Sequence, residues 1–195
     1  MGIIKTALEI ALEKTENVKS GRYSVDQFEA KQRGKKLANA FLAGEKDLAE
    51  ELKNTPSELQ ESLKQGIFDV LISQINLPAV KEDEVRIELA GKGLQTVIKN
   101  KQFNVLFQQL TLILSRYLQE ASQYEQAIRQ QYAPKLRHKE EELSRRLGRE
   151  IRIDPLQDPE FIAFFNQHMN VLKNNYEPII KQLKEEAVSL FGDAA

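Results

Sequence analysis

The sequence QFNVLFQQLTLILSRYLQEASQYEQAIRQQYAPKLRHKEEELSRRLG, residues 102–148, decides the fold of this chain. Large apolar residues recur along it at intervals of three and four, which is the spacing of one face of an α-helix. At 1.5 Å per residue, such a helix would be on the order of 70 Å long. That exceeds the ~40 Å diameter of a compact domain of this size. We therefore predict a projecting helix whose apolar stripe must be covered by a partner.

A second helical run extends from Asp158 to Gly192, and only residues 149–157 separate the two runs. Such a short connection favours an antiparallel helical hairpin. Asp158 and Pro159 predict its start, as a cap followed by a first-turn proline. Prolines inside the two runs, Pro134 and Pro178, predict a kink or bend in each. The candidate packing or interface residues are those of the second run's apolar seam: Phe161, Phe165, His168, Leu172, Tyr176 and Ile179.

The first 115 residues predict a bundle of shorter helices. Ser20-Gly21 predicts the end of a first helix, and Ser24 predicts the cap of the next one. Gly44 predicts another end, and Thr55-Pro56 predicts a restart with Thr55 as the cap. We accordingly predict two parts, a helical bundle over 1–115 and a hairpin arm over 116–195. The alternative is that both parts form one continuous domain. The two seams can pair within one chain or between two copies, and the composition does not separate these alternatives.

Residues 81–100 are ambiguous. Val85, Ile87 and Leu89 alternate as in a strand, and Gly91-Lys92-Gly93 fits a hairpin turn. Over a longer window the apolar residues follow helical spacing instead. We favour a helix because no second strand of similar quality is present to pair with the first. The fold class predicted is therefore all-α: a helical bundle with a long, coiled-coil-like antiparallel hairpin arm.

The composition excludes several classes of function. The chain has no cysteine, which excludes disulfides, thiolate zinc sites and cysteine nucleophiles. Its formal net charge of −1 gives no global attraction to nucleic acid, so no nucleic-acid partner is expected. No apolar run is long enough to cross a membrane, and the mixed charges of the N-terminal helix argue against peripheral attachment. We expect a cytoplasmic protein, although Met1-Gly2 with Thr6 matches the short myristoylation pattern.

No residue pattern reaches a chemical assignment. Carboxylate-bridged metal centres in helical bundles need a Glu three residues before a His. Lys135 and Phe165 occupy those positions before His138 and His168. Gly91-Lys92-Gly93 lacks the glycine spacing and the following Ser or Thr of a phosphate-binding loop. We therefore predict no catalytic residue, no cofactor and no metal site.

Two short segments carry a resemblance. The opening Gly2-Ile3-Ile4-Lys5-Thr6-Ala7-Leu8-Glu9 and the later Asp158-Pro159-Glu160-Phe161 resemble segments of uncharacterised bacterial all-helical proteins. This resemblance implies a helical fold and no activity.

The function expected from these features is a non-enzymatic protein–protein interaction or assembly module, which associates with itself through the arm or through an exposed Phe-rich face. Long, thin helices offer contact area but few concave sites that exclude water. The alternative is a ligand-binding or enzymatic bundle with an internal apolar pocket. That pocket would lie among Phe28, Phe41, Phe68 and Phe107.

Overall fold

The computed structural model of this protein describes residues 7–192, with side chains from residue 24 onward. Within that range it contains six α-helices and one short 3-10 helix, and no strand. The chain is therefore all-α, as predicted. Contacts divide it into two compact units. The first unit runs up to Ile75 and also contains Arg86–Phe103 and the end of the chain from Ser189; the second contains Asn76–Val85 and Asn104–Val188. The predicted boundary at residue 115 stays a prediction.

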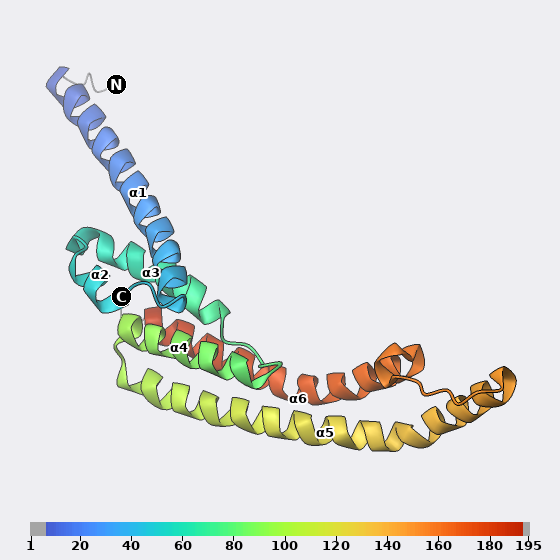
Figure 1. Cartoon of the computed structure of the whole chain (residues 1–195). Helices are drawn as coiled ribbons and strands as arrows, with labels where there is room; N and C mark the ends of the chain where they lie inside the picture. The colour runs from blue at the N-terminus through green and yellow to red at the C-terminus, as the bar shows by residue number, and fades with distance from the viewer. Residues whose placement is uncertain (1–6, 193–195) are drawn as a thin grey trace, which may run out of the picture. The chain divides into compact units, whose positions relative to one another are not determined.

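The first unit is built from α1 (Ala7–Leu42), α2 (Leu48–Lys53), α3 (Ser57–Ser73) and most of α4 (Lys81–Ile98), with α1 and α3 packed against each other (Figure 1). Its core is aliphatic: Leu48, Leu63, Ile67, Leu71 and Leu94 are almost completely buried. Phe68 stacks on Phe191, with ring centroids 4.2 Å apart. Burial of such side chains stabilises the fold by about 1.5–3 kcal/mol each.

The prediction of two helices before Gly44 was wrong, because α1 continues through Ser20-Gly21 and Ser24 to Leu42. Serine and glycine weaken a helix by about 1 kcal/mol or less, but each still donates its backbone N–H. At Ser20-Gly21 these local signals therefore do not end the helix. The end at Gly44 is confirmed: this residue has φ +77, in the left-handed region that glycine adopts without strain. The myristoylation pattern lies outside the described residues.

The restart after α2 is confirmed, although its cap differs from the prediction. Thr55 is buried and its Oγ1 donates to the Glu51 carbonyl oxygen at 2.8 Å, at the end of α2. Pro56 occupies the N-cap position of α3 and offers no side-chain acceptor. Thr55 therefore closes the preceding helix instead of opening the following one. Helix α2 itself is capped by Asp47, which accepts from the N–H groups of Ala49 and Glu50.

Residues 81–98 form helix α4, so the helical alternative is confirmed over the hairpin. Gly93 lies where a Cβ atom would meet the side chains of Leu71 and Phe41. The glycine that suggested a turn is thus a point of close packing inside a helix. The helix ends at Lys99, whose φ of 51 breaks the helical path before α5.

The second unit is dominated by α5 (Lys101–Leu147) and α6 (Pro159–Gly192), which run side by side in opposite directions in Figure 1. The connection contains the 3-10 helix η1 (Pro155–Gln157) and an extended segment before it. The predicted hairpin is confirmed. Neither Pro134 nor Pro178 interrupts its helix, although each removes one backbone hydrogen bond. None of the helices within residues 7–192 is long and apolar enough to span a lipid bilayer.

Candidate functional site

Two buried clusters hold the hairpin together along what we call the inner seam. One contains Tyr117 of α5 with Leu172 and Tyr176 of α6, and the two tyrosine rings meet edge-on with centroids 5.1 Å apart. Nearer the tip, Tyr132 of α5 packs on Phe161 of α6 at 5.3 Å. Residue numbers rise on one helix as they fall on the other, so the pairing is antiparallel. Such aromatic contacts contribute about 0.5–1.5 kcal/mol beyond the area they bury.

The six residues predicted for the second run fall into three groups. Phe161, Leu172 and Tyr176 are buried in the inner seam. Phe165 and His168 are partly buried; the His168 ring lies against Phe164, with centroids 4.4 Å apart. Ile179 is 40% exposed, whereas its neighbour Ile180 is 5% exposed. The seam thus advances by four residues after Tyr176, and a three-or-four pattern alone does not distinguish these two positions.

The inner seam repeats every eleven residues. Counted from the buried and partly buried positions, the seam of α6 contains Phe161, Phe165, Met169, Leu172, Tyr176, Ile180, Leu183 and Ala187. The seam of α5 contains Leu106, Leu110, Leu114, Tyr117, Ala121, Glu125, Ile128, Tyr132 and Leu136. Eleven residues in three turns give 3.67 per turn, slightly above the 3.6 of a straight helix. Two helices with this spacing pack with a slight right-handed twist, in contrast to the left-handed heptad coiled coil.

A buried carboxylate fixes the tip of the hairpin. Asp158 is 6% exposed, and its Oδ2 accepts from the Tyr132 hydroxyl at 3.0 Å. The Lys139 ammonium donates to both oxygens, at 2.9 and 2.8 Å. Oδ1 also accepts from the Glu160 backbone N–H, which caps the start of α6. These three donors satisfy a buried charge that would otherwise destabilise the fold.

The bonds among Asp158, Tyr132, Lys139 and Glu160, which we call the tip network, favour the ionised forms of the two carboxylates and of Lys139. The hydrogen bond from Lys139 is the largest influence on Asp158, and it holds the pKa of that carboxyl below its ordinary value. The same bond raises the pKa of Lys139. Lys139 also pairs with Glu160 at 3.0 Å. A lysine held protonated in this way is neither a base nor a nucleophile, so the network is structural.

The connection between the helices is tied to α5 by two further bonds. The Ile151 N–H donates to the Ser144 hydroxyl at 2.9 Å, and the Ile153 N–H donates to the Glu140 carboxylate at 2.8 Å. These bonds satisfy backbone groups that an extended loop would otherwise expose to water. The hairpin is therefore fixed at its tip as well as along its seam.

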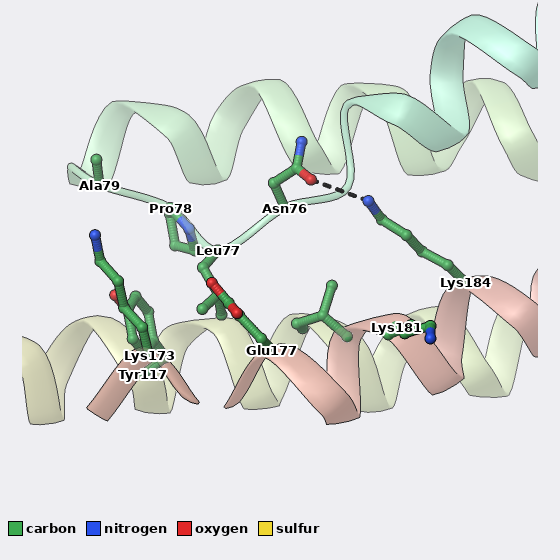
Figure 2. A pocket seen from close by; sticks show the side chains of 10 residues that line it. Asn76, Leu77, Pro78, Ala79, Tyr117, Lys173, Glu177, Lys181 and Lys184 are labelled. Atoms are coloured by element: carbon green, nitrogen blue, oxygen red, sulfur yellow. Dashed lines mark hydrogen bonds between the residues drawn. The ribbon is translucent and has the colours of Figure 1, made fainter. Parts of the chain in front are cut away.

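A groove lies where the segment between α3 and α4 crosses the hairpin (Figure 2). Asn76, Leu77, Pro78 and Ala79 form one side, and the opposite side comes from Tyr117 of α5 and from α6. The enclosed volume is about 430 Å³. The Lys184 ammonium donates to the Asn76 Oδ1 at 2.9 Å, as the dashed line in Figure 2 marks. This bond joins two residues that are 108 positions apart in the sequence.

This groove, which we call the linker groove, is lined by more positive than negative side chains. Three lysines, Lys173, Lys181 and Lys184, line it together with one carboxylate, Glu177. Burial lowers the pKa of Lys184, and no ion pair of this residue is found among the described side chains. A second hollow of about 680 Å³ shares Tyr117 and Lys173 with the groove and continues along the seam. No local pattern in the sequence indicates this groove, because its sides come from segments far apart in the chain.

The exposed face of α5 away from the inner seam has no charged residue of its own from Val105 to Gln126. We call it the outer stripe and define it by Val105, Gln108, Leu112, Ser115, Gln119, Ser122 and Gln126, all exposed. Three of its residues, Ser115, Gln119 and Ser122, also line the second hollow, beside Lys81 and Glu84. Leu112 is 73% exposed and Val105 is 56% exposed. The spacing alternates three and four, so this face has a strict seven-residue period. Toward the tip the composition changes, and charged pairs such as Arg146 with Glu142 cover the helix.

The four phenylalanines of the predicted internal pocket lie in different surroundings. Phe28 is 63% exposed, and Phe68 is buried by its stacking on Phe191. Neither hollow described above is lined by any of the four. His138 is exposed on α5. Within the described part of the chain, no three His, Asp or Glu side chains gather as metal ligands would.

Comparison with known protein families gives one match. DUF6657, a family of unknown function, matches residues 49–189. The chain belongs to this family. The matched range contains all of α5 and nearly all of α6, so the tip network, the linker groove and the outer stripe lie within the part that defines the family. Searches of curated proteins and of solved structures found no significant match.

Proposed function

We propose that this DUF6657 member is a non-enzymatic protein-interaction module that binds its partner through the α5–α6 hairpin. The observation that carries the proposal is the outer stripe. Leu112 lies within it with 73% of its surface exposed, on a helix whose apolar seam is already filled by its own partner helix. Contiguous exposed apolar surface rimmed by polar residues marks interaction sites, and Leu112 shares this uncharged face with the exposed Val105.

The rigidity of the hairpin supports this function. The buried Asp158 and the two bonds to the connection fix the tip, and the aromatic pairs fix the seam. A preformed surface loses little conformational entropy when it binds, so more of the contact energy contributes to affinity. Three further exposed apolar residues lie on α6: Ile162, Val171 and Ile179.

The test is photo-crosslinking in the native host. A benzophenone side chain is placed at Leu112, and the matched control carries it at Leu156, an equally apolar residue that is 61% exposed at the tip. We expect a discrete crosslinked protein product from position 112 and little from position 156, with the product identified by mass spectrometry. Absence of any product specific to position 112 would contradict the proposal.

A second candidate function is the binding of a small anion in the linker groove. It is supported by the excess of lysines around a volume within the ~300–1,000 Å³ range of ligand sites. Lys184 is the residue to change, because its ammonium lies in the groove without a carboxylate partner among the described residues.

This candidate is tested by thermal melting with added inorganic phosphate or citrate. Binding to the folded state raises the melting temperature in proportion to occupancy. If the groove binds anions, Lys184→Gln removes the increase, while the exposed control Lys36→Gln in the first unit retains it. An increase that is equal in both variants reflects a general salt effect and counts against the groove.

A further inference from the structure

The linker groove and the second hollow form one continuous space, which we call the hairpin channel. They share four lining residues: Pro78, Ala79, Tyr117 and Lys173. All residues that line the channel belong to the second unit. Along α6 these residues extend from Phe165 to Lys184, which is roughly 29 Å at 1.5 Å per residue. A strand rises about 3.3 Å per residue, so the channel matches an extended segment of roughly eight or nine residues.

Tyr117 lies where the two hollows meet, and its hydroxyl is free to bind a ligand. The residue is 3% exposed, and its hydroxyl has no hydrogen-bond partner among the described residues. Every fully enclosed side-chain oxygen of those residues has a partner, so this hydroxyl must open to the channel. Burial, and then the nearby Glu177 carboxylate, raise the pKa of the hydroxyl and keep it a donor. In Figure 2 the Tyr117 side chain extends from α5 into the groove beside Lys173.

The exposed charges of the channel alternate along α6. Lys173, Glu177 and Lys181 follow one another at intervals of four residues, or ~6 Å. Side chains on one face of an extended peptide are spaced by roughly 6.5 Å. Lys181 has a long contact of 3.8 Å with Glu185, and no ion pair of Lys173 is found among the described residues. Two acidic side chains of an extended peptide, four residues apart, can therefore reach both lysines.

The rest of the channel suits a peptide better than a uniformly charged chain. Its lining includes three exposed amides that can bond to peptide groups: Gln119, Asn166 and Asn170. Partly buried Phe165 and Met169 offer contact for an apolar side chain. On the linker side, Leu77 forms no backbone hydrogen bond within the described residues, so its N–H and C=O remain available to a strand. The carboxylates of Glu84 and Glu125 would repel a continuous row of phosphates.

We infer that the hairpin channel binds an extended acidic peptide segment of a partner protein. This inference rests on the proposed function and names the chemistry of the partner. Three residues of the outer stripe also line the channel: Ser115, Gln119 and Ser122. A partner that covers the stripe therefore reaches the channel as well. On one face of the segment, an apolar, an acidic, a small polar and an acidic side chain would meet, in that order, Met169, Lys173, Glu177 and Lys181.

The binding is measured by fluorescence anisotropy on the purified full chain. The probes are the labelled peptide Leu-Thr-Glu-Thr-Ser-Thr-Glu and its reversed sequence, because the spacing allows either direction. We expect saturable binding of one of them. Lys173→Glu with Lys181→Glu should weaken it ~10-fold or more, because two attractive contacts become repulsive. The matched control, Lys36→Glu with Lys92→Glu, makes the same charge change at exposed positions outside the channel and should leave the affinity unchanged.

Two further variants separate recognition from folding. A peptide with lysines in place of both glutamates should bind the Lys173→Glu, Lys181→Glu variant more tightly than it binds the wild type. A variant that failed to fold would not show this rescue. Tyr117→Phe should weaken peptide binding roughly 3–10-fold through loss of one hydrogen bond. Its melting temperature should stay that of the wild type, because the hydroxyl has no partner in the described part of the free protein to lose.

The outcomes separate this inference from the proposed function. Binding of neither peptide, or binding that survives Lys173→Glu with Lys181→Glu, overturns the inference. Citrate or a single-stranded oligonucleotide that competes as well as the unlabelled peptide would show that the channel recognises charge alone, which also overturns it. A crosslink at position 112 without peptide binding keeps the proposed function and rejects the channel as the site. Peptide binding without that crosslink keeps the channel and rejects the outer stripe as the contact surface.

Discussion

Gly34 of α1 and Gly66 of α3 form a reciprocal contact. A Cβ atom on Gly34 would collide with the carbonyl oxygen of Leu63, and a Cβ atom on Gly66 would collide with the carbonyl oxygen of Lys31. Each glycine lies three residues after the carbonyl that faces the other glycine, so the two helices cross antiparallel with their backbones in contact. The ion pair of Lys31 with Asp69, at 2.9 Å, lies beside this crossing.

At the crossing of Gly34 and Gly66 we expect alanine to destabilise the fold, the reverse of its usual effect in a helix. At an ordinary helix position, Gly→Ala stabilises by about 1 kcal/mol. At Gly34 or Gly66 the added methyl group meets backbone atoms that cannot rotate away, so we expect destabilisation of roughly 1–3 kcal/mol or more. Gly192→Ala is the control, because nothing lies near its Cβ position. Urea denaturation measures all three, and an unchanged midpoint for Gly66→Ala would show that the helices separate easily.

A charge placed at Leu172 tests how far the stability of the fold depends on the inner seam. Leu172 is 5% exposed and packs beside Tyr117 and Tyr176. Leu172→Asp should cost more than the ~2–5 kcal/mol of a buried Leu→Ala change, because it buries a charge without a partner. The neighbouring Val171→Asp, at a position that is 51% exposed, serves as the control. Thermal melting beside light scattering distinguishes unfolding from aggregation; equal melting of Leu172→Asp and wild type would rule out the hairpin.

The tip network predicts a graded response. Tyr132→Phe removes one hydrogen bond to Asp158 and keeps the packing on Phe161, so we expect a loss of about 1 kcal/mol. Asp158→Ala should cost more, since it also removes the helix cap and leaves Lys139 without its main partner. Tyr124→Phe, on the exposed side of the same helix, should fall within about 0.5 kcal/mol of wild type. The network would be contradicted if chemical denaturation showed a larger loss of stability for Tyr124→Phe than for Tyr132→Phe.

The lowered pKa of Asp158 predicts an acid-sensitive contribution to stability. An unfolded Asp titrates near pH ~3.9. Because the folded pKa lies below this value, the stabilisation is fully present above about pH 4 and is lost as the pH falls through the folded pKa. The difference in unfolding free energy between wild type and Asp158→Asn should therefore shrink from pH 7 toward pH 2. Denaturant titrations at several pH values measure it, and a difference that stays constant would mean that Asp158 has no altered pKa in the fold.

The sequence by itself determined the helices and the hairpin. Helical hydrogen bonds join residues four apart, so a run with apolar residues every three or four positions specifies its own secondary structure. The apolar run over 102–148 and the short connection after it could be interpreted without any distant contact. Phe161, Leu172 and Tyr176 were predicted as seam residues for the same reason, and they are buried.

The tertiary structure decided which of two neighbouring residues faces inward. Ile179 and Ile180 both fit a helical pattern, but only Ile180 is buried. On α5 the exposed residue is Tyr124, and the partly buried one is Glu125. Intervals of three and four are both compatible with 3.6 residues per turn, so the choice depends on where the partner helix lies.

Contacts between distant segments were likewise decided only by the tertiary structure. By local propensity a glycine only weakens a helix, yet Gly34 is a point where two backbones meet. The Asn76–Lys184 bond of the linker groove and the Tyr132–Asp158 bond of the tip network join residues whose local sequence carries no sign of the partner. A pattern along one helix records which face is apolar, whereas the identity of the group that meets that face depends on how the chain folds back on itself.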